Sequence, residues 1–141
     1  MAAEKTYVCT VTRMRVRNPL VLPAFVWASA RAAWTARRSP GNVRTRLLGL
    51  PPFPIFSTLS VWESRAALNR FAMSPGHAQA ASRMGHFAAR GRFRTFETTT
   101  PRVGWRTAGR MLREPDAVWT PQVQYRRDAA GELVAAGRPA A

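Results

Sequence analysis

The sequence is poor in cysteine: Cys9 is the only one in 141 residues. A single thiol allows no disulfide within the chain and no cluster of thiolate ligands around a metal ion. The length suits one domain with its own hydrophobic core, but hardly two. We therefore predict a single folded domain in a reducing, cytoplasmic setting.

Acidic residues are also scarce, with 7 against 22 basic residues and a formal net charge of +15. All of the basic residues except Lys5 are arginine. This charge predicts weak attraction to nucleic acid, anionic lipid or acidic partners. The arginines are spread along the chain, with no run of five or more and no zinc-finger spacing. We therefore expect no specific nucleic-acid site.

Long apolar runs are missing too. The segment NPLVLPAFVWASA, residues 18–30, is apolar, but no run reaches the roughly 18 residues that a transmembrane helix needs. The segment follows basic residues and ends in small residues, as a secretory signal does. Cleavage there would remove a predicted strand, so we expect a soluble protein without a transmembrane segment.

Strand-like and helix-like patterns follow one another along the first hundred residues. Alternation of polar and apolar residues predicts strands at 6–17, 42–50, 53–62 and 92–100. Apolar residues at helical spacing predict helices at 23–39, 64–72 and 74–89. Ser64 and Ser74 are suitable N-caps, and Pro75 suits a first helical turn. The order β-α-β-β-α-β is that of an α+β, ferredoxin-like split β-α-β sandwich.

The pattern is weaker after residue 100. Residues 101–119 are predicted to be irregular, residues 123–136 to form a hairpin that turns at 128–131, and residues 137–141 to be disordered. The ferredoxin-like domain is accordingly expected at 1–113. A C-terminal extension is expected at 114–141.

The two histidines, His77 and His86, both lie in the predicted helix 74–89. At about 100° per residue they point to opposite sides and cannot share a site. His86 is expected to face solvent. His77 lies at the centre of the apolar face, among Ala80, Ala81, Met84, Phe87 and Ala88. Its place in the first turn favours neutral imidazole, the form that binds metals.

Other site chemistries find little support. Two histidines, one cysteine and few acids make a closed zinc site improbable. The chain has no evident Ser-His-Asp arrangement and no glycine-rich phosphate loop, and no two carboxylates lie close in sequence inside an expected pocket. Glu63 and Glu97 only border predicted elements. Haem, which needs a single axial side chain, is the cofactor that these ligands best permit. The alternative is that His77 only binds a backbone carbonyl.

Residues 56–109 contain the motifs SVWES (60–64), AALNRF (66–71), PGH (75–77) and RFR (92–94). In this order they resemble the spheroidene monooxygenase-like family of the dimeric α+β barrel superfamily. SVWES and the helix after it also occur in antibiotic-biosynthesis-type monooxygenases. Two features depart from the family pattern: proline and glycine are transposed before His77, and GWRTAG at 104–109 has altered spacing.

The resemblance implies a homodimer whose two sheets close into a barrel, with a pocket between each sheet and its own helices. It implies that His77 is the axial ligand of a haem iron and a catalytic residue. Three arginines would pair with haem propionates or an acidic substrate: Arg44, Arg46 and Arg94. Five side chains would line a pocket for a hydrophobic small molecule: Phe56, Trp62, Met84, Phe87 and Trp105.

Three functions remain open. The first is a haem-dependent, monooxygenase-like tailoring enzyme that acts on a hydrophobic secondary metabolite. The second needs no cofactor and is a monooxygenase or cyclase of aromatic polyketides, with His77 as general base. The third is a non-catalytic dimeric barrel that binds a small ligand.

Overall fold

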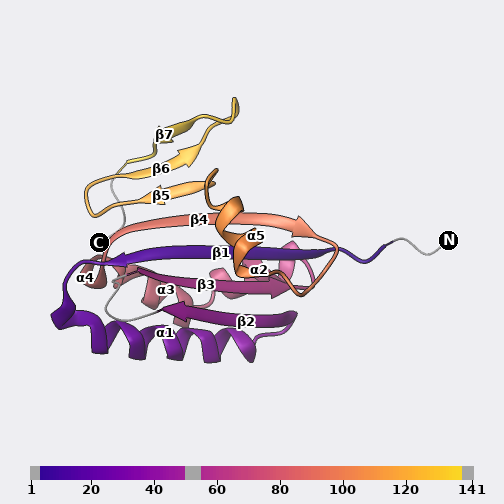
Figure 1. Ribbon diagram of the computed structural model, residues 1–141, viewed down its shortest axis with the longest axis horizontal. Coiled ribbons are helices and arrows are strands. Elements are labelled where there is room, and N and C mark those ends of the chain that lie inside the picture. Colours follow the sequence, from indigo (N-terminus) through magenta and orange to yellow (C-terminus); the bar gives the residue numbers. More distant parts are fainter. Residues whose placement is uncertain (1–3, 50–54, 138–141) are drawn as a thin grey trace.

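The computed structural model describes residues 4–49 and 55–137. One antiparallel sheet in the order β2-β3-β1-β4-β5-β6-β7 runs through it (Figure 1). The strands are β1 Tyr7–Val16, β2 Asn42–Gly49, β3 Ile55–Trp62, β4 Ala88–Thr98, β5 Ala117–Trp119, β6 Gln124–Arg127 and β7 Leu133–Ala135. The α-helices are α1 Leu22–Arg37, α2 Arg65–Ala72, α3 Pro75–Ser82, α4 Met84–Phe87 and α5 Trp105–Met111.

The first four strands and their helices form the predicted ferredoxin-like α+β fold. Strand β3 lies between β1 and β2 and is antiparallel to both, so β1, α1 and β2 form a split β-α-β unit. Strand β4 completes this part of the sheet on the other side of β1. The prediction of a mixed fold with the order β-α-β-β-α-β is confirmed.

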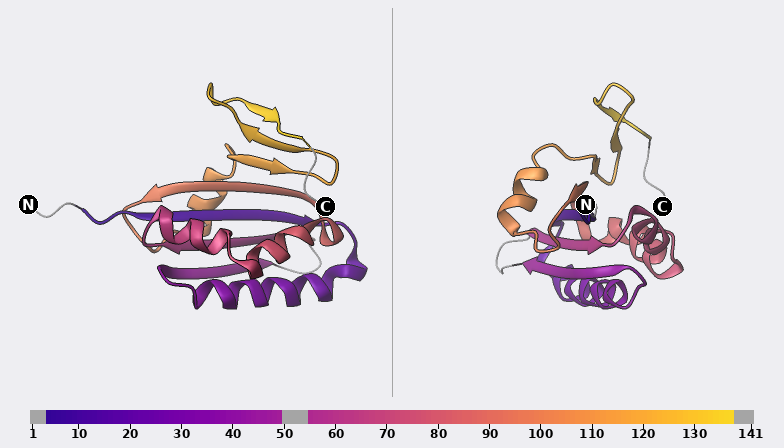
Figure 2. Two further views of the ribbon diagram at one scale, coloured as in Figure 1. Left: turned by 180° about the vertical axis from the view of Figure 1, so that it is seen from behind. Right: turned by 90° about the vertical axis from the view of Figure 1, so that its right-hand side faces the viewer.

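The sheet has two differently covered faces, because successive side chains of a strand point to opposite sides. Helix α5 packs on one face, whereas α2, α3 and α4 lie over the other and α1 runs along β2 (Figure 2). The core on the α5 face contains Cys9, Val11, Leu59, Val61, Val103, Ala108 and Leu112, each at most 4% exposed. A smaller core on the other face joins Ala36, Trp62 and Ala67.

Local signals in the sequence explain where α2 and α3 begin. The hydroxyl of Ser64 accepts a hydrogen bond from the backbone N–H of Ala67, and that of Ser74 accepts one from His77. Each bond satisfies a helix N–H that has no partner within its own helix. Pro75 fills the first turn of α3, where its missing N–H is not needed. Both predicted N-caps are therefore present.

The predicted helix 74–89 is divided into α3 and α4 and ends two residues early, at Phe87. Helix α3 ends at Ser82, the short α4 follows, and Ala88 already has extended backbone angles. Ala88 pairs with Val16, and the N–H of Arg17 donates to the carbonyl of Phe87. Hydrogen bonding to the end of β1 therefore places Ala88 and the residues after it in strand β4, which the helical pattern alone did not indicate.

Residues 101–119, predicted to be irregular, contain α5 and β5. Strand β5 pairs with β4 and carries the sheet on to β6 and β7. The two last strands form a hairpin whose turn is closed by a bond from the N–H of Gly131 to the carbonyl of Asp128. Positions 50, 53, 54 and 138–141, covered by predicted strands and a predicted disordered tail, lie outside the described residues.

The apolar segment 18–30 forms a 3-10 turn at Pro19–Val21 and the first half of α1. Within the ranges 4–49 and 55–137, no helix is long and apolar enough to cross a membrane.

Leu59 tests the core on the α5 face, because its side chain is fully buried between strands and α5. We expect Leu59→Ala to lower the free energy of unfolding by about 2 to 5 kcal/mol through lost burial and a residual cavity. Leu47→Ala on β2, where the leucine is 40% exposed, should cost less than about 1 kcal/mol. Chemical denaturation of both variants measures the difference, and equal losses would contradict this packing.

Candidate functional site

The sheet face under α2, α3 and α4 carries a band of hydroxyl groups. We call Thr10, Thr12, Thr58, Ser60 and Thr95 the hydroxyl strip, and all five are half-buried. The register places Ser60, Thr10 and Thr95 in one row across β3, β1 and β4. The hydroxyls of Thr10 and Thr95 lie 3.1 Å apart. Polar groups that solvent still reaches beneath a layer of helices can hydrogen-bond a ligand.

Aromatic rings flank one end of the strip. Trp62 stacks on Phe71 of α2, with ring centroids 5.1 Å apart, and Phe71 contacts His77 edge-on at 4.9 Å. The indole N–H of Trp62 donates to the Ser60 hydroxyl over 2.9 Å. The ring system of Trp62 is thus joined to the hydroxyl strip on one side and, through Phe71, to His77 on the other.

A second aromatic group lies toward the other end of β1 and β3. Phe25 of α1 packs against Phe56 and Phe87, with ring centroids 5.0 and 6.0 Å apart. Phe56 pairs with Met14, four residues along β1 from the Thr10–Ser60 pair. Met84, the remaining predicted residue on this side, is half-buried on α4. The face therefore offers two aromatic groups with hydroxyls between them.

A hydrogen bond between its ring and the backbone holds His77 in one orientation. Its Nδ1 lies 3.1 Å from the carbonyl oxygen of Ala72. A carbonyl can only accept, so Nδ1 donates and Nε2 keeps the free lone pair of the neutral ring. Burial lowers the pKa of His77 below its ordinary value, partly opposed by this backbone bond. A neutral imidazole with an available Nε2 can act as a general base.

The three predicted arginines lie on the opposite face of the sheet. Arg44 pairs with Val61, Arg46 with Leu59, and Arg94 with Val11. Those partners belong to the core beneath α5, and paired residues of neighbouring strands point to the same face. Arg46 also lies over the ring of Trp105 at 5.8 Å. The sheet therefore separates these arginines from His77.

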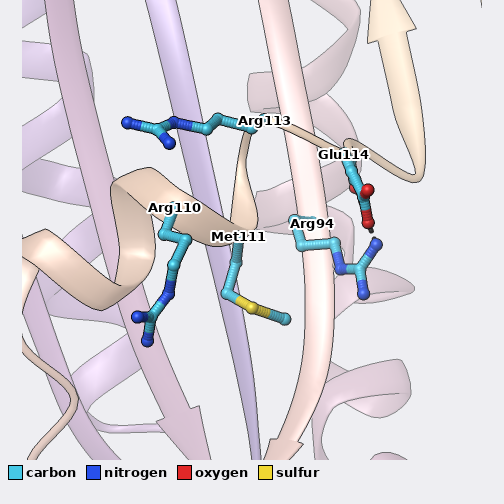
Figure 3. Close-up of a pocket in the computed structure, with 5 residues that line it drawn as sticks. All are labelled: Arg94, Arg110, Met111, Arg113 and Glu114. Atoms are coloured by element: carbon cyan, nitrogen blue, oxygen red, sulfur yellow. Dashed lines mark hydrogen bonds between the residues drawn. The ribbon is translucent and has the colours of Figure 1, made fainter.

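Arg94 lines a depression of about 290 Å³ together with Arg110, Met111, Arg113 and Glu114 (Figure 3). Its Nη1 donates to the Glu114 carbonyl over 2.7 Å and lies 3.6 Å from a carboxylate oxygen of Asp116. Among the described residues, its buried Nε has no hydrogen-bond partner. Arg44 lines a separate depression of about 420 Å³ with Val43, Pro101 and Arg102.

The predicted site is thus divided between two places. His77, Phe56, Trp62, Met84 and Phe87 lie on the helix-covered face. Trp105 is a residue of α5 and packs against the core of the other face, where Arg44, Arg46 and Arg94 also lie. The division follows from strand alternation, since neighbouring positions on β2, β3 and β4 point to opposite sides.

Haem does not fit the residues predicted to hold it. A haem whose iron met Nε2 of His77 would lie on the helix-covered face, whereas the three arginines predicted for its propionates lie across the sheet. Elsewhere in residues 4–49 and 55–137, no group of three or more His, Cys, Asp or Glu side chains could hold a metal ion. Cys9 offers no nucleophile, because burial raises its pKa to about 12.

Comparison with solved structures places this fold among known proteins. A mutant of SnoaB, a cofactor-independent oxygenase from Streptomyces nogalater, matches with 25% sequence identity and a TM-score of 0.58, over 72% of this chain and 97% of that one. A putative antibiotic biosynthesis monooxygenase from Nitrosomonas europaea matches with 17% identity and a TM-score of 0.61, also over 72% and 97%. The fold is that of the antibiotic biosynthesis monooxygenases.

These neighbours belong to the dimeric α+β barrel superfamily named by the sequence resemblance. Neither a family model nor a curated protein matches the sequence. The spheroidene monooxygenase-like family therefore stays a prediction. The solved structures support a likeness to monooxygenase-type proteins with a ferredoxin-like fold.

Sequence reasoning missed the hydroxyl strip. Its signal is the alternation of Thr or Ser within TVT (10–12), STLS (57–60) and the strand around Thr95. The alternation in these segments predicts strands but does not show which of their residues lie side by side. Only the register of β3, β1 and β4 shows that these polar residues form one band beneath the helices.

The titration of His77 can be measured directly. We expect its pKa to lie below the ordinary 6.5, because burial disfavours the charged ring. The unfolded chain then binds a proton more readily than the folded one, so His77 lowers stability as pH falls from 6.5 through its folded pKa. NMR titration of the histidine ring protons measures the pKa, and denaturation at several pH values measures the stability.

Two variants assign the effect. His77→Gln should remove the shifted resonance and reduce the loss of stability on acidification, whereas His86→Gln, which changes an exposed ring, should do neither. A His77 resonance that titrates at or above the ordinary value would contradict the burial of this ring.

Proposed function

We propose that this protein is an oxygenase that needs no cofactor and acts on an aromatic, hydrophobic secondary metabolite bound between the sheet and α2, α3 and α4. The observation that carries the proposal is the likeness to SnoaB over nearly the whole of that enzyme. The neutral His77 beside an aromatic ring supports it. The division of the predicted haem ligands between two faces disfavours the haem-dependent alternative.

The proposed reaction begins with proton transfer to Nε2 of His77. A polycyclic hydroxyaromatic with one activated methylene group loses a proton there and becomes an electron-rich carbanion. The carbanion supplies the electrons that reduce O2, so no metal or flavin is required. Overall, CH2 and O2 become a carbonyl and water: one oxygen atom enters the product, and the other leaves with both hydrogens.

The two aromatic groups suit such a substrate. Flat rings can contact Phe71 at one end, where the fully buried Trp62 lies behind it, or Phe56 and Phe87 at the other. Hydroxyl or carbonyl groups of the substrate can bond the hydroxyl strip between them. In this proposal Met84 lines the same space, and Trp105 serves the core beneath α5 instead.

We also propose that the protein works as a homodimer in the cytoplasm. The dimer is supported by the superfamily to which the neighbouring structures belong. The compartment is supported by the single, buried cysteine, since secreted domains of this size commonly use disulfides.

Oxygen uptake with an anthrone as substrate tests the reaction. Wild-type protein, treated with a chelator and supplied with no metal, should raise oxygen consumption above the spontaneous rate. His77→Ala should lower kcat by about 100-fold or more through loss of the base. His86→Ala is the matched control, because it removes an exposed histidine from α4, and it should retain full activity.

The same assay separates the alternatives. Activity that appears only after haemin is added, with a Soret shift lost in His77→Ala, would favour the haem enzyme. Saturable anthrone binding without oxygen uptake would favour the non-catalytic barrel. Equal activity in the His77→Ala and His86→Ala variants would reject His77 as the base.

A further inference from the structure

Helix α1 has a second apolar side that packs against nothing in the described part of the chain. Its inner side carries Phe25, Ala33 and Ala36, which are buried. Trp27 and Trp34 lie two turns apart on the outer side and are 71% and 58% exposed. Leu20, in the turn before α1, is 87% exposed. Figures 1 and 2 show α1 along the margin of the fold, with no described element beyond it.

Basic residues share this outer side. Arg31 follows Trp27 by four positions, Arg38 follows Trp34 by four, and both arginines are exposed. The guanidinium of Arg38 lies over the ring of Trp34, 4.7 Å from its centroid. We call Leu20, Trp27, Arg31, Trp34 and Arg38 the outer stripe.

The surroundings of the outer stripe carry only positive charge in the sequence. No Asp or Glu occurs between Glu4 and Glu63. That stretch holds eight arginines, of which Arg31, Arg37 and Arg38 belong to α1 or its C-cap, whereas Arg44 and Arg46 lie on the other face of the sheet. It includes β1, α1, β2 and β3, and β2 is the strand on which α1 packs. An anionic partner is therefore the one that this surface attracts.

We propose that the outer stripe of α1 binds the surface of an anionic lipid bilayer. Trp27 and Trp34 enter the region between headgroups and acyl chains, where indole rings are favoured because one edge is polar and the rest apolar. Arg31 and Arg38 contact the lipid phosphates around them. The helix lies in the plane of the membrane and does not cross it.

Two other occupants fit less well. A second copy of α1 would bring Arg31 and Arg38 of both chains together with no acid in α1 to compensate them. A single-stranded nucleic acid could stack on the two tryptophans, but it gives Leu20 no apolar surroundings. A bilayer satisfies the apolar and the basic residues at once.

The proposal does not depend on the proposed oxygenase reaction, because the outer stripe and His77 belong to different helices and α1 turns its other side to the sheet. Failure of one proposal would leave the other standing. If both hold, the bilayer is a source from which a hydrophobic substrate reaches the protein.

Sedimentation with lipid vesicles tests the outer stripe. Full-length protein is mixed with vesicles of phosphatidylglycerol and phosphatidylcholine in equal parts, and with vesicles of phosphatidylcholine alone. We expect binding to the mixed vesicles that weakens at high salt, together with a blue shift of tryptophan fluorescence. Trp27→Ala/Trp34→Ala should reduce the partition coefficient by about tenfold or more, and Arg31→Gln/Arg38→Gln by a similar factor.

Matched controls change other exposed residues. Met73→Ala removes a side chain that is 82% exposed after α2, and Arg90→Gln/Arg126→Gln removes the same charge as the α1 double variant. Both should bind vesicles nearly as well as the wild type. Circular dichroism and thermal unfolding confirm that each variant is folded, as expected for changes at exposed positions.

Four results would overturn the proposal. The wild type could fail to bind the mixed vesicles, or the tryptophan variant could bind them as well as the wild type does. Gel filtration could show a dimer that only the tryptophan variant loses, which would assign the stripe to a second copy. A fluorescent oligothymidylate could bind more tightly than the vesicles and depend on the same tryptophans, which would assign it to nucleic acid.

Discussion

The hydrogen-bonded position of β1 between β3 and β4 determines most of this structure. Eight consecutive residues of β1, from Val8 to Arg15, are paired on both sides without a break in register. Because side chains alternate along a strand, this register decides for three strands at once which residues meet α5 and which meet the other helices. A shift by one residue would exchange Val11 and Leu59 for threonines in the core.

The same alternation explains why the candidate site lies where it does. One face of the sheet buries aliphatic side chains beneath α5, and the other places hydroxyls and aromatic rings beneath α2, α3 and α4. His77 reaches this second face because Ser74 and Pro75 begin α3 there, and the Ala72 carbonyl then fixes its ring. Arg44, Arg46 and Arg94 lie on the first face, so the sheet separates them from His77.

Helix α1 shows how one element can serve the fold and still leave surface for a partner. On its inner side, Phe25 packs against the aromatic rings of Phe56 and Phe87. Its outer residues take no part in that packing, yet two of them are tryptophans. Large apolar groups exposed together on a monomer commonly mark an interaction surface, and the absence of nearby acids in the sequence restricts the chemistry of what binds there.

The sequence by itself determined the ferredoxin-like order of strands and helices, the N-caps at Ser64 and Ser74, and the place of His77 in the first turn of a helix, because alternation, helical spacing and capping are local properties. Only the tertiary structure decided that Ala88 joins a strand, that residues 105–119 form a helix and a further strand, and that Arg44, Arg46, Arg94 and Trp105 lie away from His77. Those outcomes depend on which strands pair and in what register, and residues far apart in the chain set the register together.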